Sequence, residues 1–494
     1  MKQQSLFSLL AQGLEATLRE DNPWWRGERI FALPAMQRWA FAPLLAGVKN
    51  GPTAITVLRG PRQIGKTTLL NQVIHALLDE GVAPHRLFRV QFDELPQLKQ
   101  LPEPILELVR WYAKNMLKKS LNQAAWDGEP AYIFLDEVQN LADWAPQLKH
   151  LVDMHPVRVI VTGSSALRIE AGRDSLAGRI TTLEMGPLFL REIAAIRKLG
   201  NLNGFLPANG LAPMKEKSFW QELRLYGETH RDARRLAFEA FSSHGAYPIA
   251  HARADLPWEA LAQLLNETVI RRALQHDLRL GPRGQKRDEH LLEEVFRLAC
   301  RYLGQAPSQA RYLNELQRAM NANVGWQRVL AYLKFLDGTL LVRLIEPLEL
   351  RLKRKRGAPK ICLCDHALRA AWLQELVSLT AIPAYHLAEL AGHIAESVAG
   401  YFLRSILNLE VAHFPERGAE PEVDFVLTIG EQRIPLEVKY RRHIDHNDTM
   451  GVRAFIEKAH YRAPFGLLIT LEDEAASDDP RLVSLPLSTL LLLR

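Results

Sequence analysis

The chain has 494 residues, of which 47% are apolar and 24% charged, with a formal net charge of +6. This length exceeds what one hydrophobic core serves, so we expect several domains. The composition is that of a folded globular protein and excludes a low-complexity or fibrous chain. No apolar run is long enough to predict a membrane span. The mild positive excess favours an acidic partner such as nucleic acid.

Cysteine usage and the first residues bear on the cellular compartment. Three cysteines cannot form a disulfide framework, and the spacing of Cys362 and Cys364 does not match a zinc pair. The beginning of the chain lacks the long apolar region of a signal peptide. We therefore expect a cytoplasmic protein in a reducing compartment, with no membrane attachment.

Residues 1–50 predict a helical leading segment, amphipathic up to Glu20 and then broken by a turn that carries Trp24 and Trp25. The two indoles have two possible roles. They can stack on a purine, or they can anchor the segment in the core, which is the commoner use of paired tryptophans.

Residues 60–68 form the clearest motif, a phosphate-binding loop of the pattern G-x-x-x-x-G-K-[ST]. The apolar run 54–58 predicts a buried strand before it, and 67–78 has helical spacing after it, which is the context this motif requires. Backbone amides then face the phosphates, Lys66 reaches their β and γ oxygens, and Thr67 offers a hydroxyl to Mg²⁺. The expected nucleotide-binding residues are Gly60, Gln63, Ile64, Gly65, Lys66, Thr67, Thr68 and Asp136.

Further strand patterns alternate with helices through residue 185 and predict a parallel α/β sheet over residues 51–185. These patterns cover residues 86–92, 132–137, 157–162 and 180–184. Ligands bind at the carboxyl ends of such strands. Asp136 at one strand end is predicted to hold Mg²⁺ together with Thr67, and Glu137 to polarise the attacking water.

Two further groups near this sheet edge have open alternatives. Ser164 or Ser165 either senses the γ-phosphate and positions water or caps the following helix. Arg179 either reaches the nucleotide of an adjacent subunit as an arginine finger or forms a surface salt bridge.

Residues 22–185 resemble the prokaryotic AAA+ ATPases of the archaeal-type ATPase group. The matching stretches are 22–27, 60–68, 135–140, 162–165 and 176–179. The resemblance implies that ATP is bound and hydrolysed by the residues named above, at subunit interfaces of a ring such as a hexamer. It leaves open whether Arg179 or Arg173 acts in trans.

Residues 186–287 are mostly helical, and we interpret them as the helical lid of an AAA+ module. Within them, residues 244–248 resemble the Gly-Gly-Tyr-Pro turn that members of the group carry after the ATPase core. Ala246 replaces the second glycine of that turn.

Residues 288–385 predict a winged helix domain. Helical patterns at 289–303, 309–320 and 326–335 precede a hairpin whose last strand is 360–363. Its third helix would be the recognition element. The hairpin tip carries four basic residues that predict contacts with the DNA backbone; the alternative is a charged turn in a domain that mediates subunit contacts. These residues are Lys353, Arg354, Lys355 and Arg356.

Residues 386–494 contain a second group of chemically active side chains on a predicted hairpin, with strands 423–429 and 432–440 around a two-residue turn. Counting back from that turn places Asp424 opposite Glu437. Strand alternation puts Lys439 on the same face as Glu437. Two facing carboxylates repel one another unless a divalent cation binds between them, so they predict a metal site. Lys439 would orient the attacking water and stabilise a phosphorane-like transition state.

The order Glu396, Asp424, Glu437, Lys439 resembles the PD-(D/E)xK nucleases, with Val423 in the place of the proline. The whole chain resembles AAA+ ATPases that carry such a nuclease-like C-terminal domain. The resemblance implies a restriction-endonuclease-like α/β fold, with Asp424 and Glu437 as metal ligands and Glu396 and Lys439 as catalytic residues. A surface cluster of Glu, Asp and Lys is the alternative.

The sequence thus predicts an α/β protein with a P-loop AAA+ parallel-sheet core, a helical lid, a winged helix domain and the nuclease-like tail. Its predicted function is a Mg²⁺- and ATP-dependent machine acting on DNA, with branched or forked forms among the candidate substrates. Two alternatives stay open. One is a DNA motor whose tail recognises DNA without cutting it, and the other is a nucleotide-dependent switch or scaffold in a signalling or defence complex.

Overall fold

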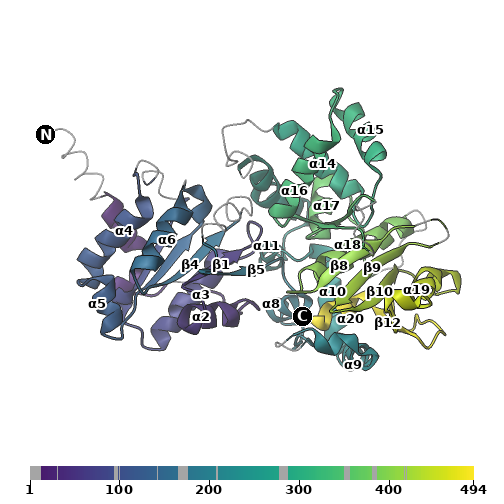
Figure 1. Ribbon diagram of the computed structural model, residues 1–494, viewed down its shortest axis with the longest axis horizontal. Helices are drawn as coiled ribbons and strands as arrows, with labels where there is room; N and C mark the ends of the chain where they lie inside the picture. Colours follow the sequence, from purple (N-terminus) through teal and green to yellow (C-terminus); the bar gives the residue numbers. More distant parts are fainter. Residues whose placement is uncertain are drawn as a thin grey trace. The chain divides into compact units, whose positions relative to one another are not determined.

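The structure is a computed structural model, and it divides the chain into two compact units, one ending at Met185 and one beginning at Gly186 (Figure 1). We describe each unit by itself. The residues that the structure describes are 13–30, 32–93, 98, 101–141, 143–164, 176–206, 210–276, 288–349, 357–380, 387–416, 418 and 420–494.

The first unit is built on a parallel five-stranded sheet with the order β2-β3-β4-β1-β5. Its strands are β1 (Ile55–Arg59), β2 (Leu87–Gln91), β3 (Tyr132–Asp136), β4 (Arg158–Gly163) and β5 (Ile180–Glu184). All five lie where the apolar runs predict them, because a sheet covered on both faces selects nearly continuous apolar strands. Strand β4 lies between β1 and β3 and so brings the carboxyl ends of these three strands together.

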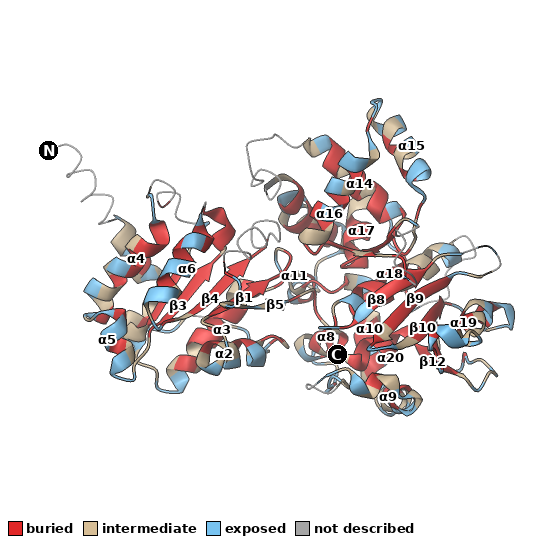
Figure 2. Ribbon diagram, viewed as in Figure 1, coloured by how far each residue is buried: buried red, intermediate tan, exposed pale blue. Residues whose placement is uncertain are grey.

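Helices cover the sheet and bury β1 to β4, as Figure 2 shows in red. They are α2 (Phe41–Asn50), α3 (Lys66–Asp79), α4 (Pro104–Tyr112), α5 (Leu121–Trp126) and α6 (Trp144–Met154), with short turns η1 (Pro23–Arg26), η2 (Pro84–Arg86), η4 (Ala113–Leu117) and η5 (Val138–Asn140). Helix α3 begins at Lys66, within the phosphate-binding motif, and continues through the residues whose helical spacing predicts it.

The leading segment is anchored in this unit by side chains that bond to edge strand β2. The buried Asn22 amide donates to the Arg89 carbonyl at 2.9 Å and accepts from the Arg89 N–H at 2.7 Å, in the manner of one more strand residue. Trp24 and Trp25 both donate their indole N–H to the carbonyl of Leu87. The structure therefore supports the anchoring role of the two tryptophans.

The second unit begins with helices, the first three of which pack on the C-terminal end of the chain. These are α8 (Leu190–Arg197), α9 (Lys217–Thr229), α10 (Arg231–His244), α11 (Pro248–Ala252) and α12 (Trp258–Leu265), with η6 (Ala212–Lys215), η7 (Asn266–Ile270) and η8 (Arg272–His276). Arg234 of α10 forms an ion pair with Asp473 at 2.9 Å and donates to Thr489. A Cβ on Gly227 of α9 would lie 2.4 Å from the Thr489 hydroxyl, so α9 approaches this end closely.

Three helices and a hairpin follow, in the order along the chain that we expect from the sequence for a winged helix. They are α14 (Glu289–Arg301), α15 (Gln309–Met320), α16 (Trp326–Gly338), β6 (Val342–Ile345) and β7 (Lys360–Leu363), followed by α17 (His366–Leu373). Strands β6 and β7 pair antiparallel, with Val342 opposite Leu363. The basic cluster Lys353, Arg354, Lys355 and Arg356 lies outside the described residues.

The tail is a mixed five-stranded sheet with the order β12-β11-β10-β9-β8. Its elements are α18 (Ala388–Arg404), β8 (Glu410–Phe414), β9 (Val423–Ile429), β10 (Gln432–Lys439), α19 (Met450–Ile456), β11 (Gly466–Thr470), β12 (Leu482–Pro486) and α20 (Leu487–Leu490), with η10 (Asn447–Thr449), η11 (Ala459–Tyr461) and η12 (Leu491–Leu493). Strands β9 and β10 form the predicted hairpin, with Gln432 opposite Ile429 and Leu436 opposite Phe425. One further step along this register places Asp424 opposite Glu437.

In the part of the chain that the structure describes, none of the helices combines the length and apolar character that a membrane span needs.

The turn that resembles Gly-Gly-Tyr-Pro connects α10 to α11 and contacts the N-terminus of α17. Gly245 has φ +73°, and a Cβ there would lie 2.4 Å from both the Asp365 carboxylate and the Ala367 Cβ. The Ala246 N–H donates to Asp365 at 2.7 Å. Glycine is therefore required at 245 both for its left-handed backbone and for this close approach.

We predict that Gly245→Ala destabilises the protein by about 2–4 kcal/mol, because left-handed strain adds to a steric clash beside a buried carboxylate. The matched control is Gly418→Ala, at a glycine with φ +63° and nothing within 4 Å of the added Cβ. It should cost only the strain, about 1–2 kcal/mol. Urea unfolding of both variants measures the difference, and equal losses would contradict the proposed clash.

Candidate functional site

The phosphate-binding loop connects β1 to α3, and two of its glycines are required, the first by its surroundings and the second by its left-handed backbone. A Cβ on Gly60 would lie 2.1 Å from the Met185 carbonyl oxygen and 2.4 Å from the Ile64 side chain. Gly65 has φ +90° at the N-terminus of α3, where an added Cβ would meet nothing within 4 Å. The loop is therefore closely packed at its first glycine and open at its last, which leaves helix N–H groups accessible to an anion.

Lys66 lies within this loop and faces the predicted catalytic carboxylate. Its side chain is 4% exposed, and its ammonium donates to the carbonyl oxygens of Gly60 at 3.1 Å and Pro61 at 2.9 Å. The same nitrogen is 3.5 Å from Glu137 Oε1. The lysine thus bridges the loop and the end of β3.

Asp136 ends β3 and is fully buried. It accepts hydrogen bonds from the hydroxyls of Thr67 and Thr162, and an Arg89 nitrogen is 3.5 Å away. Burial raises the pKa of Asp136, whereas Arg89 and the two hydroxyls oppose the shift. The structure therefore brings Thr67 and Asp136, the predicted Mg²⁺ ligands, into direct contact.

Glu137 has a left-handed backbone with φ +53°, which turns its side chain toward Lys66. Burial alone would raise the pKa of Glu137, but the positive charges of Lys66 and Arg62 outweigh it and lower that pKa. Ser164 donates to Glu137 Oε2 at 3.3 Å and accepts from Gln139 at 3.1 Å. The predicted sensor serine thus holds the carboxylate in place, whereas Ser165 and Arg173 lie outside the described residues.

Arg179 precedes β5 and forms a two-point ion pair with Asp153. The Nε–Oδ1 distance is 2.5 Å and the Nη2–Oδ2 distance 3.0 Å, with each side chain more than a third exposed. In this structure Arg179 forms the surface salt bridge, one of the two roles that its sequence position leaves open.

Three residues that sequence reasoning missed organise this site. Thr162 donates to the Asp136 carboxylate and accepts the Glu137 backbone N–H at 3.0 Å, so one hydroxyl positions both residues. An Arg89 nitrogen lies 3.5 Å from Asp136 on the β2 side, and Asn22 bonds to the Arg89 backbone. The position of Thr162 near the end of β4, the strand beside β3, could have predicted its contact with Asp136. Arg89 and Asn22 belong to segments far from Asp136 in the sequence, so their part in the site could not be predicted in this way.

The assembled groups fit a Mg²⁺-bound nucleoside triphosphate. Lys66 and the open loop suit phosphate oxygens, and the touching Thr67 hydroxyl and Asp136 carboxylate are hard oxygen donors of the kind Mg²⁺ prefers. Glu137, kept ionised by Lys66 and Arg62, suits a water-polarising role.

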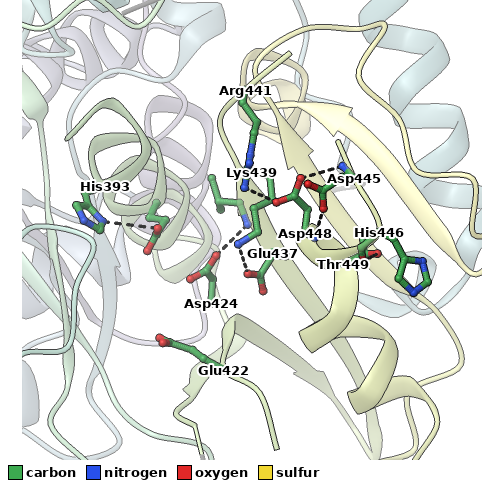
Figure 3. Close-up of polar contacts among 12 residues, drawn as sticks. His393, Glu422, Asp424, Glu437, Lys439, Arg441, Asp445, His446, Asp448 and Thr449 are labelled. Carbon is green, nitrogen blue, oxygen red and sulfur yellow. Dashed lines mark hydrogen bonds and ion pairs between the residues drawn. The ribbon is translucent and has the colours of Figure 1, made fainter. Parts of the chain in front are cut away.

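Asp424, Glu437 and Lys439, three of the predicted residues of the tail, come together on β9 and β10 (Figure 3), and Glu396 lies on α18. Asp424 and Glu437 are 7% and 8% exposed, and the Lys439 ammonium is 2.8 Å from Glu437 Oε1. Asp424 Oδ2 accepts the Val438 N–H at 3.0 Å. Burial and the neighbouring Asp424 charge raise the pKa of Glu437 to about 8. The arrangement on one face of the hairpin is thus the predicted one.

An unpredicted residue, Lys360 of β7, occupies the centre of this tail site. Its ammonium is 2.7 Å from Asp424 Oδ1, 3.1 Å from Glu396 Oε2 and 3.8 Å from Glu422 Oε1. Burial acts to lower the pKa of Lys360, but the carboxylates outweigh it and raise that pKa well above its ordinary value. Among the described residues, no three Asp, Glu, His or Cys side chains are arranged to hold a metal ion.

The fold and the first site define a P-loop ATPase domain of the AAA type, and residues 52–194 match the family described as an AAA domain. Residues 235–377 and 391–490 match two families described as domains of unknown function, DUF8612 and DUF4143.

An uncharacterized protein of Methanocaldococcus jannaschii is 28% identical to this chain over 155 residues, which are 31% of this chain and 30% of that protein. An uncharacterized protein of Mycobacterium tuberculosis is 27% identical over 199 residues, 39% of each. The matches thus span between three and four tenths of these relatives. Among solved structures, the Walker-type ATPase of Pyrococcus abyssi aligns with 14% identity and a TM-score of 0.40, over 69% of this chain and 99% of its own.

We predict that Thr162→Val lowers kcat for ATP hydrolysis by about 10–100-fold and changes KM for ATP much less. The valine keeps the shape of the side chain but loses both hydrogen bonds of the hydroxyl, one to the Asp136 carboxylate and one from the Glu137 N–H. Thr162→Ser retains the hydroxyl and is the matched control. Steady-state ATPase kinetics of the two variants test this. Equal kcat for valine and serine would show that the hydroxyl has no role.

Proposed function

We propose that the protein is a Mg²⁺-dependent ATPase that couples ATP hydrolysis to action on DNA. The proposal for the ATPase is carried by one observation, the contact of Lys66 with Glu137 beside the Thr67–Asp136 pair. Lys66 binds the phosphate oxygens, Thr67 and Asp136 hold the metal, and Glu137 orients and polarises the attacking water. Mg²⁺, when bound, supplies positive charge to those oxygens.

The assembly we propose is a homo-oligomeric ring such as a hexamer, with Arg179 acting on the nucleotide of the adjacent subunit. In that role Arg179 exchanges Asp153 for a phosphate, which is a favourable partner for a planar guanidinium. Its exposure supports the proposal, because an exposed ion pair is weak and readily exchanged.

The pair Arg179–Asp153 offers a direct test. As an arginine finger, Arg179→Ala lowers kcat by about 10³-fold, whereas Asp153→Asn leaves kcat unchanged or raises it, since it frees the arginine. If the pair serves only as a surface salt bridge, both variants keep full ATPase activity. ATP turnover at several protein concentrations measures this, and equal small effects of the two variants would reject the finger.

The action on DNA is proposed from the positive net charge, the three helices and hairpin α14–β7, and the tail site. Basic residues 353–356 would contact the phosphate backbone without base preference. In the tail, the closeness of Asp424, Glu437 and Lys439 on one hairpin supports the proposal that Glu396, Asp424, Glu437 and Lys439 act as nuclease residues. The alternative, a motor whose tail recognises DNA without cutting it, is favoured by Lys360, which neutralises the carboxylates.

One set of assays separates these functions. The unaltered protein, Lys66→Ala, Asp424→Ala and Lys439→Ala are incubated with linear, forked and four-way DNA, with Mg²⁺ and with or without ATP. Lys66→Ala should abolish ATP hydrolysis. Cleavage that Asp424→Ala and Lys439→Ala abolish while ATPase activity remains identifies a nuclease. DNA-stimulated ATP turnover without cleavage identifies the motor. A nucleotide-dependent change of oligomer with no ATP turnover, even with DNA, would instead identify a switch or scaffold.

A further inference from the structure

We infer that Lys360 is the resident cation of the tail site: its ammonium takes the place that a divalent metal ion would need, and the tail binds no such ion while Lys360 is there. The inference concerns the tail site of the proposed function and rests on that site being the nuclease-like one. The Lys360 side chain is almost fully buried, with 2% of it exposed. A charge so buried is stable only beside opposite charges, which here are Asp424 and Glu396.

Backbone packing fixes the position of Lys360. The Leu363 N–H of β7 donates to the Ser397 hydroxyl of α18 at 2.9 Å. A Cβ on Gly400 of α18 would lie 2.5 Å from Cys362 Sγ and 2.7 Å from the Phe425 ring, so helix, β7 and β9 approach closely. These contacts fix the strand β7 that carries Lys360 against α18 and β9. The Lys360 ammonium also lies 5.0 Å from the centre of the Phe425 ring.

The oxygens that a metal ion would need are already engaged. Asp424 Oδ1 accepts from Lys360 and Oδ2 from the Val438 N–H, and Glu396 Oε2 accepts from Lys360. Glu437 has one oxygen paired with Lys439, and its Oε2 has no hydrogen-bond partner among the described residues. A cation seated between Asp424 and Glu396 would meet the Lys360 ammonium at close range and be repelled by it.

Removing Lys360 has a defined consequence. The Glu396 and Asp424 carboxylates lose their shared counter-ion and are left buried beside one another. A divalent cation such as Mn²⁺ or Mg²⁺, which prefers carboxylate oxygens, can then offset their charge. The Lys360→Met variant keeps the length of the side chain and removes its charge, so it should create a divalent cation site that the unaltered protein lacks.

The test counts bound Mn²⁺ by electron paramagnetic resonance on the full chain without nucleotide, so that DNA and cleavage play no part. Lys360→Met should bind an additional Mn²⁺ ion relative to the unaltered chain, and Lys360→Met with Asp424→Asn should lose it. Lys360→Arg keeps the positive charge and should bind no additional ion. Any Mn²⁺ near the phosphate-binding loop is common to all variants and cancels in the comparison.

Two results would overturn the inference. One is a bound Mn²⁺ in the unaltered chain that Asp424→Asn alone removes, and the other is a folded Lys360→Met variant with no additional ion. If Lys360→Met melts early, Mn²⁺ should raise its Tm, and adding Glu396→Gln and Asp424→Asn should restore it by removing the uncompensated charge. Failure of both rescues also rejects the inference. A protein that never acts on DNA would leave the Mn²⁺ counts unaffected, so the two proposals fail separately.

Discussion

The compensation of buried charge is the constraint on which both units of this protein depend. In the second unit, the Lys360 ammonium lies among carboxylates in a site from which solvent is almost excluded. Removing one partner of such a pair typically costs about 3–5 kcal/mol, because the remaining charge is left buried without a counter-ion. The tail sheet, the hairpin that carries Lys360 and α18 must therefore fold together around this group.

The ATPase core meets the same constraint with different groups. Asp136 is fully buried, and two threonine hydroxyls and Arg89 surround it. Glu137 retains its charge because Lys66 and Arg62 lie close enough to outweigh burial. The left-handed backbone at Glu137 costs about 1–2 kcal/mol and is held by its hydrogen bond to Thr162. The end of β3 thus combines a strained backbone at Glu137 with a fully buried carboxylate at Asp136.

Much of the fold could be predicted because it depends on residues close together in the chain. The strands of the core appear where apolar runs occur, and the β9–β10 register follows from a two-residue turn. The roles of Asn22 and Arg89 were missed because they exist only when the leading segment lies along β2, 67 residues away. Lys360 was missed for the same reason, since in the sequence it is only the first residue of a hairpin strand.

Some features depend only on residues close together in the chain: hydrophobic periodicity, the phosphate-binding loop and turn chemistry. The sequence by itself therefore determined the position of the nucleotide site, the three helices with their hairpin, and the pairing of Asp424 with Glu437. Only the tertiary structure decided which charges compensate one another. It paired Arg179 with Asp153 and inserted Lys360 between Asp424 and Glu396 across 64 and 36 positions of sequence. The physical reason is that desolvation is a property of the assembled core: a carboxylate takes the nearest cation that folding brings to it, whatever its distance along the chain.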